Sequence, residues 1–173
     1  MTTETQKAEH VQVLVLDVDG VLTDGRLYYG NAGEELKAFN IKDGLGIKLL
    51  QSAGVDVAII TGRRSEIVNR RASELGITHI VQGREDKLVA LHELCDQLGI
   101  TPADCAYMGD DLPDLAAITA AGLGMTVADG AATVRDAADW CSQAPGGCGA
   151  VREACEFILA AKGALHAALE TFR

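Results

Sequence analysis

The sequence is short of positive charge, and it contains no long apolar run. Its 15 lysine and arginine residues stand against 25 aspartate and glutamate residues, which gives a formal net charge of -10. Nucleic acids and anionic membranes attract basic proteins, so this charge argues against both as partners. No stretch approaches the ~18 consecutive apolar residues that span a membrane, and residues 1–10 lack the apolar centre of a signal peptide. We therefore expect a soluble, cytoplasmic protein.

Paired cysteines are also missing, although the chain has five cysteine residues. They are scattered along the sequence and no two form a C-x-x-C pair, so neither a zinc site nor a disulfide framework is indicated. Free cysteines are commonly buried as small apolar residues. We expect Cys148, which lies in a glycine-rich loop, to be the only cysteine near solvent.

What the chain does contain is an apolar segment at 11–16 that runs directly into two carboxylates, Asp17 and Asp19. A segment that is apolar on both faces is typical of a central parallel strand covered by helices. The two acids then follow its carboxyl end, where open α/β sheets bind their ligands. Alternate residues of an extended segment point the same way, so both could face one pocket. By itself the pattern would also suit an acidic turn.

Strand and helix patterns alternate along the remaining chain. Strand patterns cover 55–60, 78–81, 105–108, 124–127 and the surroundings of Trp140. Helical patterns lie between them at 43–50, 65–75, 87–98, 112–121 and 131–137, and a last one covers 151–169. Asp43 is the expected N-cap of the first helix. The alternation predicts an α/β fold with a doubly wound parallel sheet. No linker divides the sequence, so we expect one domain over 1–173.

A β-hairpin is expected at 25–40, between the first strand and the first helix. Two short β-prone runs flank Gly30-Asn31-Ala32-Gly33, and such glycine-rich turns connect antiparallel strands. A second irregular segment, Pro145-Gly146-Gly147-Cys148-Gly149, precedes the last helix. Its glycines allow a close approach of backbone to a ligand.

Polar side chains follow four of the predicted strands: Asp17 and Asp19, Thr61 and Arg63, Lys87, and Asp110, Asp111 and Asp114. The carboxyl ends of parallel strands share one edge of a sheet, so these clusters should converge. Such a set suits phosphoryl transfer. Asp17 can attack phosphorus and form a covalent aspartyl-phosphate, while Asp19 can protonate the leaving oxygen and later deprotonate water.

The same chemistry requires compensation of negative charge. A hard divalent cation, Mg²⁺, would neutralise Asp17 and Asp110 so that a phosphate dianion can approach. The Thr61 hydroxyl and the Lys87 ammonium would hold phosphoryl oxygens as their charge redistributes.

Four motifs resemble those of the haloacid dehalogenase superfamily, in order and at workable spacing: LVLDVDGVLTDG, IITGRRSEIV, EDKL and YMGDDLPDL. The resemblance spans 13–115 and implies a Rossmann-like haloacid dehalogenase fold. It implies these roles: nucleophile, Asp17; acid/base, Asp19; phosphate binding, Thr61 and Lys87; Mg²⁺ binding, Asp17, Asp110 and the backbone carbonyl of Asp19. Asp111 and Asp114 could orient the metal or Lys87, or cap the helix that follows.

Members of this superfamily often cover the site with an additional domain inserted after the first or the third strand. Here only the hairpin at 25–40 occupies the first place, and 81–105 has room for little more than one helix. We therefore expect no cap domain. Such a site is open to water unless another element closes it. We expect oligomerisation through the hairpin to close it.

Within the superfamily, longer segments resemble the 3-deoxy-D-manno-octulosonate 8-phosphate phosphatase family: GNAGEELKAFNIKDGLGIKLL, TGRRSEIVNRR, YMGDDLPDL and PGGCGAVREACEFIL. This family acts in lipopolysaccharide precursor synthesis, and the resemblance implies a homotetramer whose hairpins assemble together. It implies that the sugar acid phosphate contacts Asp19, Asn40, Ile41, Lys42, Asp43, Gly44, Lys48, Arg63, Arg71 and Lys87. Guanidinium groups match carboxylates bidentately, which suits Arg63 and Arg71 to the acid group of the sugar.

The resemblance also implies that the glycine-rich tail of one subunit reaches a neighbour's site. We expect the segment at 145–152 to close that site, with Arg152 bringing a positive charge to the substrate. The alternative is that this segment is only a linker to the last helix.

Three alternative functions remain open. One is a phosphatase of a nine-carbon sialic-type sugar acid 9-phosphate, although such relatives carry an acid in place of Arg63. Another is a non-catalytic partner of a sugar nucleotidyltransferase, against which the intact Asp17, Asp19, Lys87 and Asp110 argue. A β-phosphoglucomutase-like transferase is the third, and the missing cap domain disfavours it.

Overall fold

The computed structural model describes residues 3–33 and 35–173, and it is built around one parallel sheet. The sheet has six strands in the order β5-β4-β1-β6-β7-β8, and every neighbouring pair is parallel. The strands are β1 (Val13–Leu16), β4 (Asp56–Thr61), β5 (His79–Gln82), β6 (Cys105–Gly109), β7 (Leu123–Thr126) and β8 (Trp140–Cys141). The doubly wound α/β sheet is thereby confirmed.

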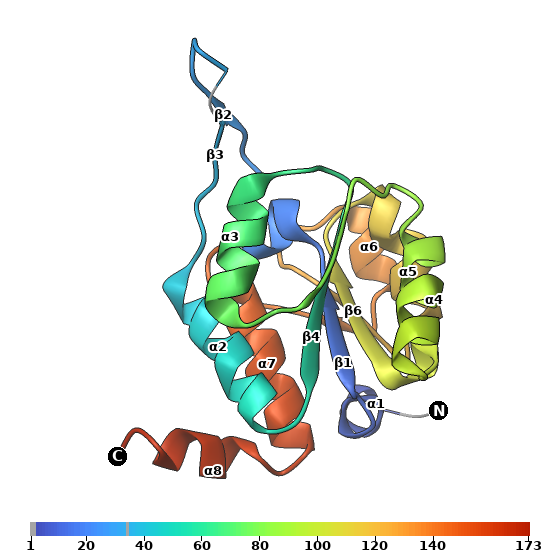
Figure 1. The fold of residues 1–173 in the computed structure, drawn as a ribbon. Helices are drawn as coiled ribbons and strands as arrows, with labels where there is room; N and C mark the ends of the chain where they lie inside the picture. Colours follow the sequence, from blue (N-terminus) through green and yellow to red (C-terminus); the bar gives the residue numbers. More distant parts are fainter. Residues whose placement is uncertain (1–2, 34) are drawn as a thin grey trace.

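Helices cover both faces of this sheet (Figure 1). They are α1 (Glu4–Glu9), α2 (Ile41–Ser52), α3 (Glu66–Leu75), α4 (Lys87–Leu98), α5 (Leu115–Ala120), α6 (Ala132–Ala137), α7 (Ala150–Ala161) and α8 (Leu165–Glu170). Side chains of α1, α2, α3 and α7 share one buried cluster with Leu14 and Leu16 of β1. Those of α4, α5 and α6 share the other with Val13 and Val15. Since successive strand residues point to opposite faces, β1 supplies both halves of the core.

The end of β1 turns sharply instead of continuing as a strand. A single turn of π-helix spans Val18–Leu22, and Gly20 within it has a φ of 92°. Only glycine adopts that backbone region without strain, which allows the chain to reverse directly behind the first two carboxylates. The tight turn keeps Asp17 and Asp19 at the edge of the sheet.

The hairpin is confirmed as an arm that projects from the body beside α3 (Figure 1). Strands β2 (Tyr28–Tyr29) and β3 (Glu35–Leu36) pair antiparallel, and the Gly33 N–H donates to the Gly30 carbonyl at 3.1 Å. No further domain is inserted among the described residues, because the segments that join the strands hold the helices named above and short turns.

Three expectations about local structure are wrong. Helix α2 begins at Ile41 because Asn40 is its N-cap and accepts a hydrogen bond from the Lys42 N–H at 2.8 Å. Asp43 lies inside the helix, where it is buried and accepts from the Arg152 N–H at 2.9 Å. The last helix is divided into α7 and α8, since Gly163 between them has a φ of 70°. Cys141 is exposed as well as Cys148, because it lies on the two-residue edge strand β8.

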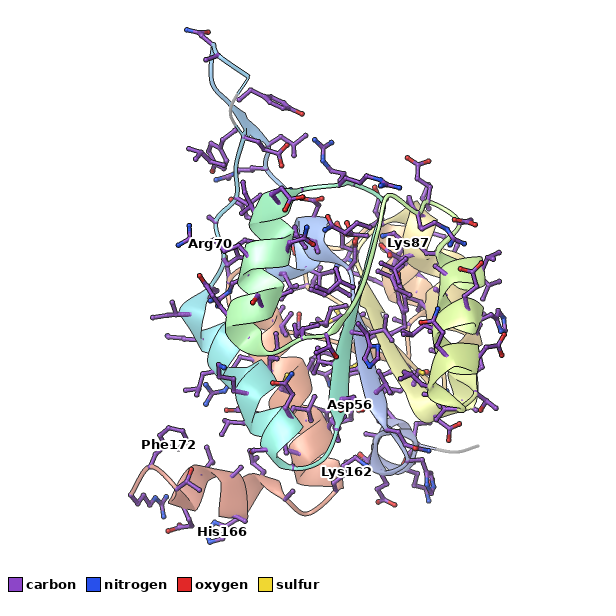
Figure 2. All side chains as sticks on the ribbon, viewed as in Figure 1. Asp56, Arg70, Lys87, Lys162, His166 and Phe172 are labelled. Atoms are coloured by element: carbon purple, nitrogen blue, oxygen red, sulfur yellow. The ribbon has the colours of Figure 1, made fainter. Side chains whose placement is uncertain are left out.

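The two ends of the sheet carry different side chains. Figure 2 shows Lys87 at the end where the strands finish, and Asp56 and Lys162 at the opposite end. Among the described residues, no helix is both long enough and apolar enough to cross a membrane. Open α/β sheets bind their ligands at the carboxyl ends of the strands, which is the end where Lys87 lies.

Candidate active site

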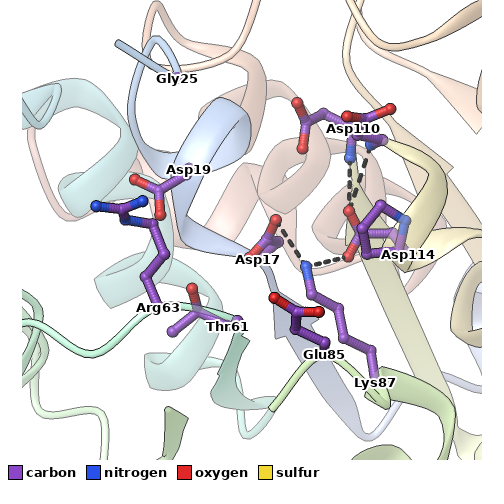
Figure 3. Close-up of a pocket in the computed structure, with 12 residues that line it drawn as sticks. Asp17, Asp19, Gly25, Thr61, Arg63, Glu85, Lys87, Asp110 and Asp114 are labelled. Carbon is purple, nitrogen blue, oxygen red and sulfur yellow. Dashed lines mark hydrogen bonds and ion pairs between the residues drawn. The ribbon is translucent and has the colours of Figure 1, made fainter. Parts of the chain in front are cut away.

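Side chains from the strand ends meet in one cavity at the carboxyl edge of the sheet (Figure 3). The cavity has a volume of about 360 Å³. Its lining includes members of every polar cluster that the sequence placed there: Asp17 and Asp19 after β1, Thr61 and Arg63 after β4, Lys87 at the start of α4, and Asp110, Asp111 and Asp114 after β6. The predicted convergence is confirmed.

Asp17 lies at the centre of this cavity. Its N–H donates to the Met108 carbonyl at 3.0 Å, so its backbone is held by the neighbouring strand β6. Its Oδ2 lies 2.9 Å from Lys87 Nζ. Its Oδ1 is buried and has no hydrogen-bond partner among residues 3–33 and 35–173. A buried oxygen without a partner is costly unless a ligand uses it. Oδ1 is thus available to a metal ion or to phosphorus.

Lys87 opens α4, and its ammonium group bridges two buried carboxylates. Nζ lies 2.9 Å from Asp17 and 2.7 Å from Asp114, with the lysine side chain only 5% exposed. Burial by itself lowers the pKa of Lys87, but attraction to Asp17 and Asp114 outweighs burial and raises the pKa above its ordinary value. Lys87 is therefore positively charged at neutral pH.

Asp114 holds this lysine in place. Its Oδ1 accepts hydrogen bonds from Lys87 Nζ and, at 3.0 Å, from the Tyr107 hydroxyl. Its Oδ2 accepts from the N–H groups of Asp110 at 3.2 Å and Asp111 at 3.4 Å. Of the roles left open for the two acids, Asp114 thus has the one that orients Lys87. Asp111 instead caps the following turn by accepting from the Leu112 N–H at 2.8 Å.

Tyr107 is a site residue that sequence reasoning missed. It lies within the apolar strand β6 and is fully buried, so its pattern is that of a core residue. Its hydroxyl reaches Asp114 only because the chain turns back after β6. A tyrosine in an otherwise apolar strand was the available signal, since buried hydroxyl groups usually find a partner.

The carboxylates at this edge fit a divalent cation. Oxygens of Asp17, Asp110 and Asp114 lie within 4.8 Å of one another. Burial raises the pKa of Asp110 to about 7, and repulsion from Asp17 and Asp114 adds to this effect. Burial and then the charge of Asp114 raise the pKa of Asp17 as well. A cation would relieve this repulsion. Since Asp114 already accepts four hydrogen bonds, Asp17 and Asp110 are the fitting ligands, and their hard oxygens suit Mg²⁺.

Close packing of glycines forms the wall next to Asp110. A Cβ on Gly20 would lie 2.0 Å from Asp110 Oδ2, and a Cβ on Gly146 would lie 1.8 Å from the Gly20 carbonyl oxygen. The Gly147 N–H also donates to the Val21 carbonyl at 2.9 Å. The segment at 145–149 therefore packs against the turn after β1 of its own chain.

This packing shows how the tail is anchored. The Gly146 N–H donates to Asp129 at 2.9 Å and the Gly147 N–H to the Val21 carbonyl, so the glycine-rich segment is fixed on its own chain. Closure of a neighbour's site by this segment stays a prediction. Arg152 donates from Nε to Glu156 at 2.6 Å, one turn further along α7. Its guanidinium is thus held on its own helix and does not line the cavity.

Thr61 and Arg63 lie on the side of the cavity opposite Asp110 (Figure 3). Thr61 is the last residue of β4 and is 2% exposed. The Arg63 guanidinium reaches the hairpin arm, where it donates to the Tyr29 hydroxyl at 3.2 Å and lies 3.5 Å from Glu35 Oε2. The arm therefore contacts the site through Arg63.

The remaining residues assigned to substrate binding lie outside the cavity lining of this chain. Asn40 caps α2, and Ile41, Lys42 and Lys48 are exposed on that helix, whereas Asp43 and Gly44 are buried in it. Arg71 on α3 lies over the Phe39 ring at 5.8 Å. Arg63 and Arg71 are thus not brought together in one pocket.

The fold and the site define the class of this protein. Residues 42–122 match the family model of haloacid dehalogenase-like hydrolases. A curated protein of Escherichia coli (strain K12), 3-deoxy-D-manno-octulosonate 8-phosphate phosphatase, is 48% identical over 162 residues that cover 94% of this chain and 86% of that protein. The chain belongs to the haloacid dehalogenase-like hydrolases.

Solved structures agree with this assignment. The 3-deoxy-D-manno-octulosonate 8-phosphate phosphatase from Moraxella catarrhalis, in complex with magnesium, phosphate and KDO, is 49% identical with a TM-score of 0.97 and covers 98% of each chain. The cobalt-bound deoxy-D-mannose-octulosonate 8-phosphate phosphatase from Haemophilus influenzae is 44% identical with a TM-score of 0.89, and the match covers 92% of this chain and 94% of that one. The present chain is similar to both over almost its whole length.

Proposed function

We propose that this protein is an Mg²⁺-dependent phosphatase that hydrolyses 3-deoxy-D-manno-octulosonate 8-phosphate to the free sugar acid and phosphate, in lipopolysaccharide precursor synthesis. The observation that carries the proposal is the buried array Asp17–Lys87–Asp114 beside Asp110, in a cavity that also receives Asp19. The similarity to phosphatases of this substrate supports the choice of sugar acid.

The first half of the reaction transfers the phosphoryl group to the protein. Asp17 Oδ1 attacks phosphorus as the bond to the leaving oxygen breaks, and Asp19 gives that oxygen its proton. Lys87 and the Thr61 hydroxyl hold the phosphoryl oxygens, and Asp114 keeps Lys87 in position. Mg²⁺, when bound by Asp17 and Asp110 with the Asp19 carbonyl, supplies positive charge that offsets the carboxylates and the phosphate.

The second half releases phosphate. The Asp19 carboxylate takes a proton from water as the water oxygen attacks phosphorus, and the bond between phosphorus and Asp17 breaks. Both carboxylates return to their starting forms. The open cavity suits this step, because water can reach the aspartyl-phosphate without the opening of a cap domain.

The sugar acid part of the substrate requires cations beyond those that hold phosphate. Arg63, at the mouth of the cavity, is proposed to bind the carboxylate of the substrate. Asn40, Ile41, Lys42, Asp43, Gly44, Lys48 and Arg71 lie away from the cavity of their own chain, so their proposed substrate contacts require a neighbouring copy. The proposal therefore includes a single-domain subunit, a homotetramer and a cytoplasmic location, all carried over from the sequence resemblance.

A panel of phosphate esters tests the proposal directly. Phosphate release would be measured with Mg²⁺ for the eight-carbon sugar acid 8-phosphate, a nine-carbon sialic-type acid 9-phosphate and glucose 6-phosphate. We expect the highest kcat/KM for the eight-carbon substrate. A preference for the nine-carbon acid phosphate would show that this ester, and not the eight-carbon one, is the substrate. No phosphate release from any ester would refute the phosphatase function.

A further inference from the structure

The hairpin arm carries a lysine that none of the catalytic motifs contains, and this lysine is buried against the site. Lys37 directly follows β3, and its side chain is 1% exposed. Its ammonium group forms an ion pair with Asp19 and a second one, at 3.3 Å, with Glu35 Oε1. Lysine is almost never fully buried unless carboxylates compensate its charge. One of the two carboxylates here is the proposed acid/base.

The position of Lys37 separates it from the phosphate-binding lysine. Lys87 and Arg63 line the cavity, whereas Lys37 does not. Lys37 instead contacts Asp19, whose own carboxyl group faces the cavity (Figure 3). Lys37 therefore touches the reacting groups only through Asp19.

The arm holds Lys37 by further charges. Glu35 pairs with Lys37 on one side and lies 3.5 Å from the Arg63 guanidinium on the other. Asp19, Lys37, Glu35 and Arg63 thus form a row of charges that alternate in sign. Such a row fixes each member more firmly than an isolated surface pair does, because every internal charge has two partners.

We infer that Lys37 is a positioning residue for Asp19, and this inference rests on the acid/base role in the proposed function. As the Asp17–phosphorus bond forms and the bond to the leaving oxygen breaks, the proton of Asp19 moves to that oxygen and leaves a carboxylate. Lys37 stabilises this carboxylate and keeps it oriented toward the cavity. The same carboxylate then accepts the proton of the attacking water.

The leaving group provides the test. The p-nitrophenolate ion departs from p-nitrophenyl phosphate without protonation, whereas the alkoxide of glycerol 3-phosphate needs a proton. Lys37→Met should lower kcat/KM for the alkyl ester by about 10- to 100-fold, and for the aryl ester by less than about threefold, because kcat/KM covers the steps through departure of the leaving group. Lys37→Arg should restore much of the activity on the alkyl ester.

Two further variants serve as controls. Lys7→Met removes another lysine–aspartate pair, with Asp139 at 2.5 Å on a part of the chain remote from the cavity, and should leave both esters unchanged. Asp19→Asn should show the same preference for the aryl ester as Lys37→Met. Thermal melting of Lys37→Met and the wild-type protein checks that the variant is folded. If methionine prevents folding, Lys37→Gln replaces it in the comparison of the two esters.

The double variant Asp19→Asn/Lys37→Met distinguishes positioning from an independent role. It should be no slower on the alkyl ester than Asp19→Asn alone. Equal losses of Lys37→Met on both esters, no loss on either, or additive losses in the double variant would overturn the inference. Because both probes are simple esters, their ratio does not depend on which sugar acid is the natural substrate. A panel that favours another sugar acid would thus leave this test intact, whereas no release from either probe by the wild-type protein would remove the phosphatase function itself.

Discussion

Replacing Asp114 by asparagine should separate the anchoring of Lys87 from the chemistry of Asp17. The substitution keeps the shape of a side chain that is 1% exposed but removes its charge. It weakens two hydrogen bonds at Oδ1, from Lys87 at 2.7 Å and from the Tyr107 hydroxyl at 3.0 Å. Hydrogen bonds to charged groups contribute about 1.5–3 kcal/mol each.

Two features reduce the net cost. Lys87 keeps Asp17 as a partner at 2.9 Å, so the lysine is not left as an unpaired buried charge. The repulsion that Asp114 exerts on Asp17 and Asp110 also disappears. We therefore expect Asp114→Asn to lower the free energy of unfolding by about 1–3 kcal/mol, below the 3–5 kcal/mol typical of a fully broken buried pair. We also expect kcat/KM to fall by about 10- to 100-fold, because Lys87 loses the group that aims it.

Urea denaturation at pH 7 without Mg²⁺ measures the first effect, in a cycle with Lys87→Met and the double variant. The coupling between Asp114 and Lys87 should be about 1–3 kcal/mol. Tyr107→Phe serves as the matched control, since it removes one neutral donor to Asp114 and should cost about 0.5–1.5 kcal/mol. A coupling below about 0.5 kcal/mol would refute the anchoring role of Asp114.

Three further predictions concern the metal, the substrate and the glycine wall. Without metal, the melting temperature should fall as pH rises from 5 to 8. Burial raises the pKa of Asp110 to about 7 in the folded chain, which therefore binds more protons than the unfolded chain over this range. Mg²⁺ should raise the melting temperature most near pH 8, and a melting temperature of the metal-free protein that does not change with pH would contradict this. Arg63→Ala should lower kcat/KM for the sugar acid phosphate by about 100-fold, the scale of a lost charge-assisted pair, and should barely change kcat/KM for p-nitrophenyl phosphate. Equal losses of kcat/KM on the two substrates would show that Arg63 acts at the phosphoryl group. Gly146→Ala should destabilise the protein by about 1–3 kcal/mol, because its Cβ would overlap the Gly20 carbonyl; an unchanged melting temperature would show that the loop moves freely.

Much of the fold could be predicted because its signals are local. Helices α3 and α4 end at Gly76 and Gly99, which adopt the left-handed conformation typical of helix ends. Their bounds agree with expectation to within a residue. The start of α2 was expected too late in the chain, although Asn40 is a preferred N-cap residue whose side chain accepts a hydrogen bond from the Lys42 N–H at 2.8 Å. Asp43 looked like an N-cap, but it is buried by a contact with Arg152, which is distant in sequence.

The residues of the site likewise include some that the sequence could predict and some that it could not. Asp17, Lys87 and Asp110 could be placed together because each follows a strand of a parallel sheet. Tyr107 and Lys37 could not, because one resembles a core residue and the other follows a two-residue strand on an exposed arm. Their importance depends on contacts with Asp114 and Asp19 that the chain makes only when folded.

The central claim is that Asp17 accepts the phosphoryl group of a sugar acid phosphate. Rapid acid quench of a single turnover, with the phosphoryl group of 3-deoxy-D-manno-octulosonate 8-phosphate radiolabelled and the protein in excess, tests it most directly. We predict a transient label on the protein that maps to Asp17, forms before free phosphate and is missing in a folded Asp17→Asn variant. Phosphate release at the wild-type rate with no labelled protein at any time, or from Asp17→Asn itself, would contradict the account.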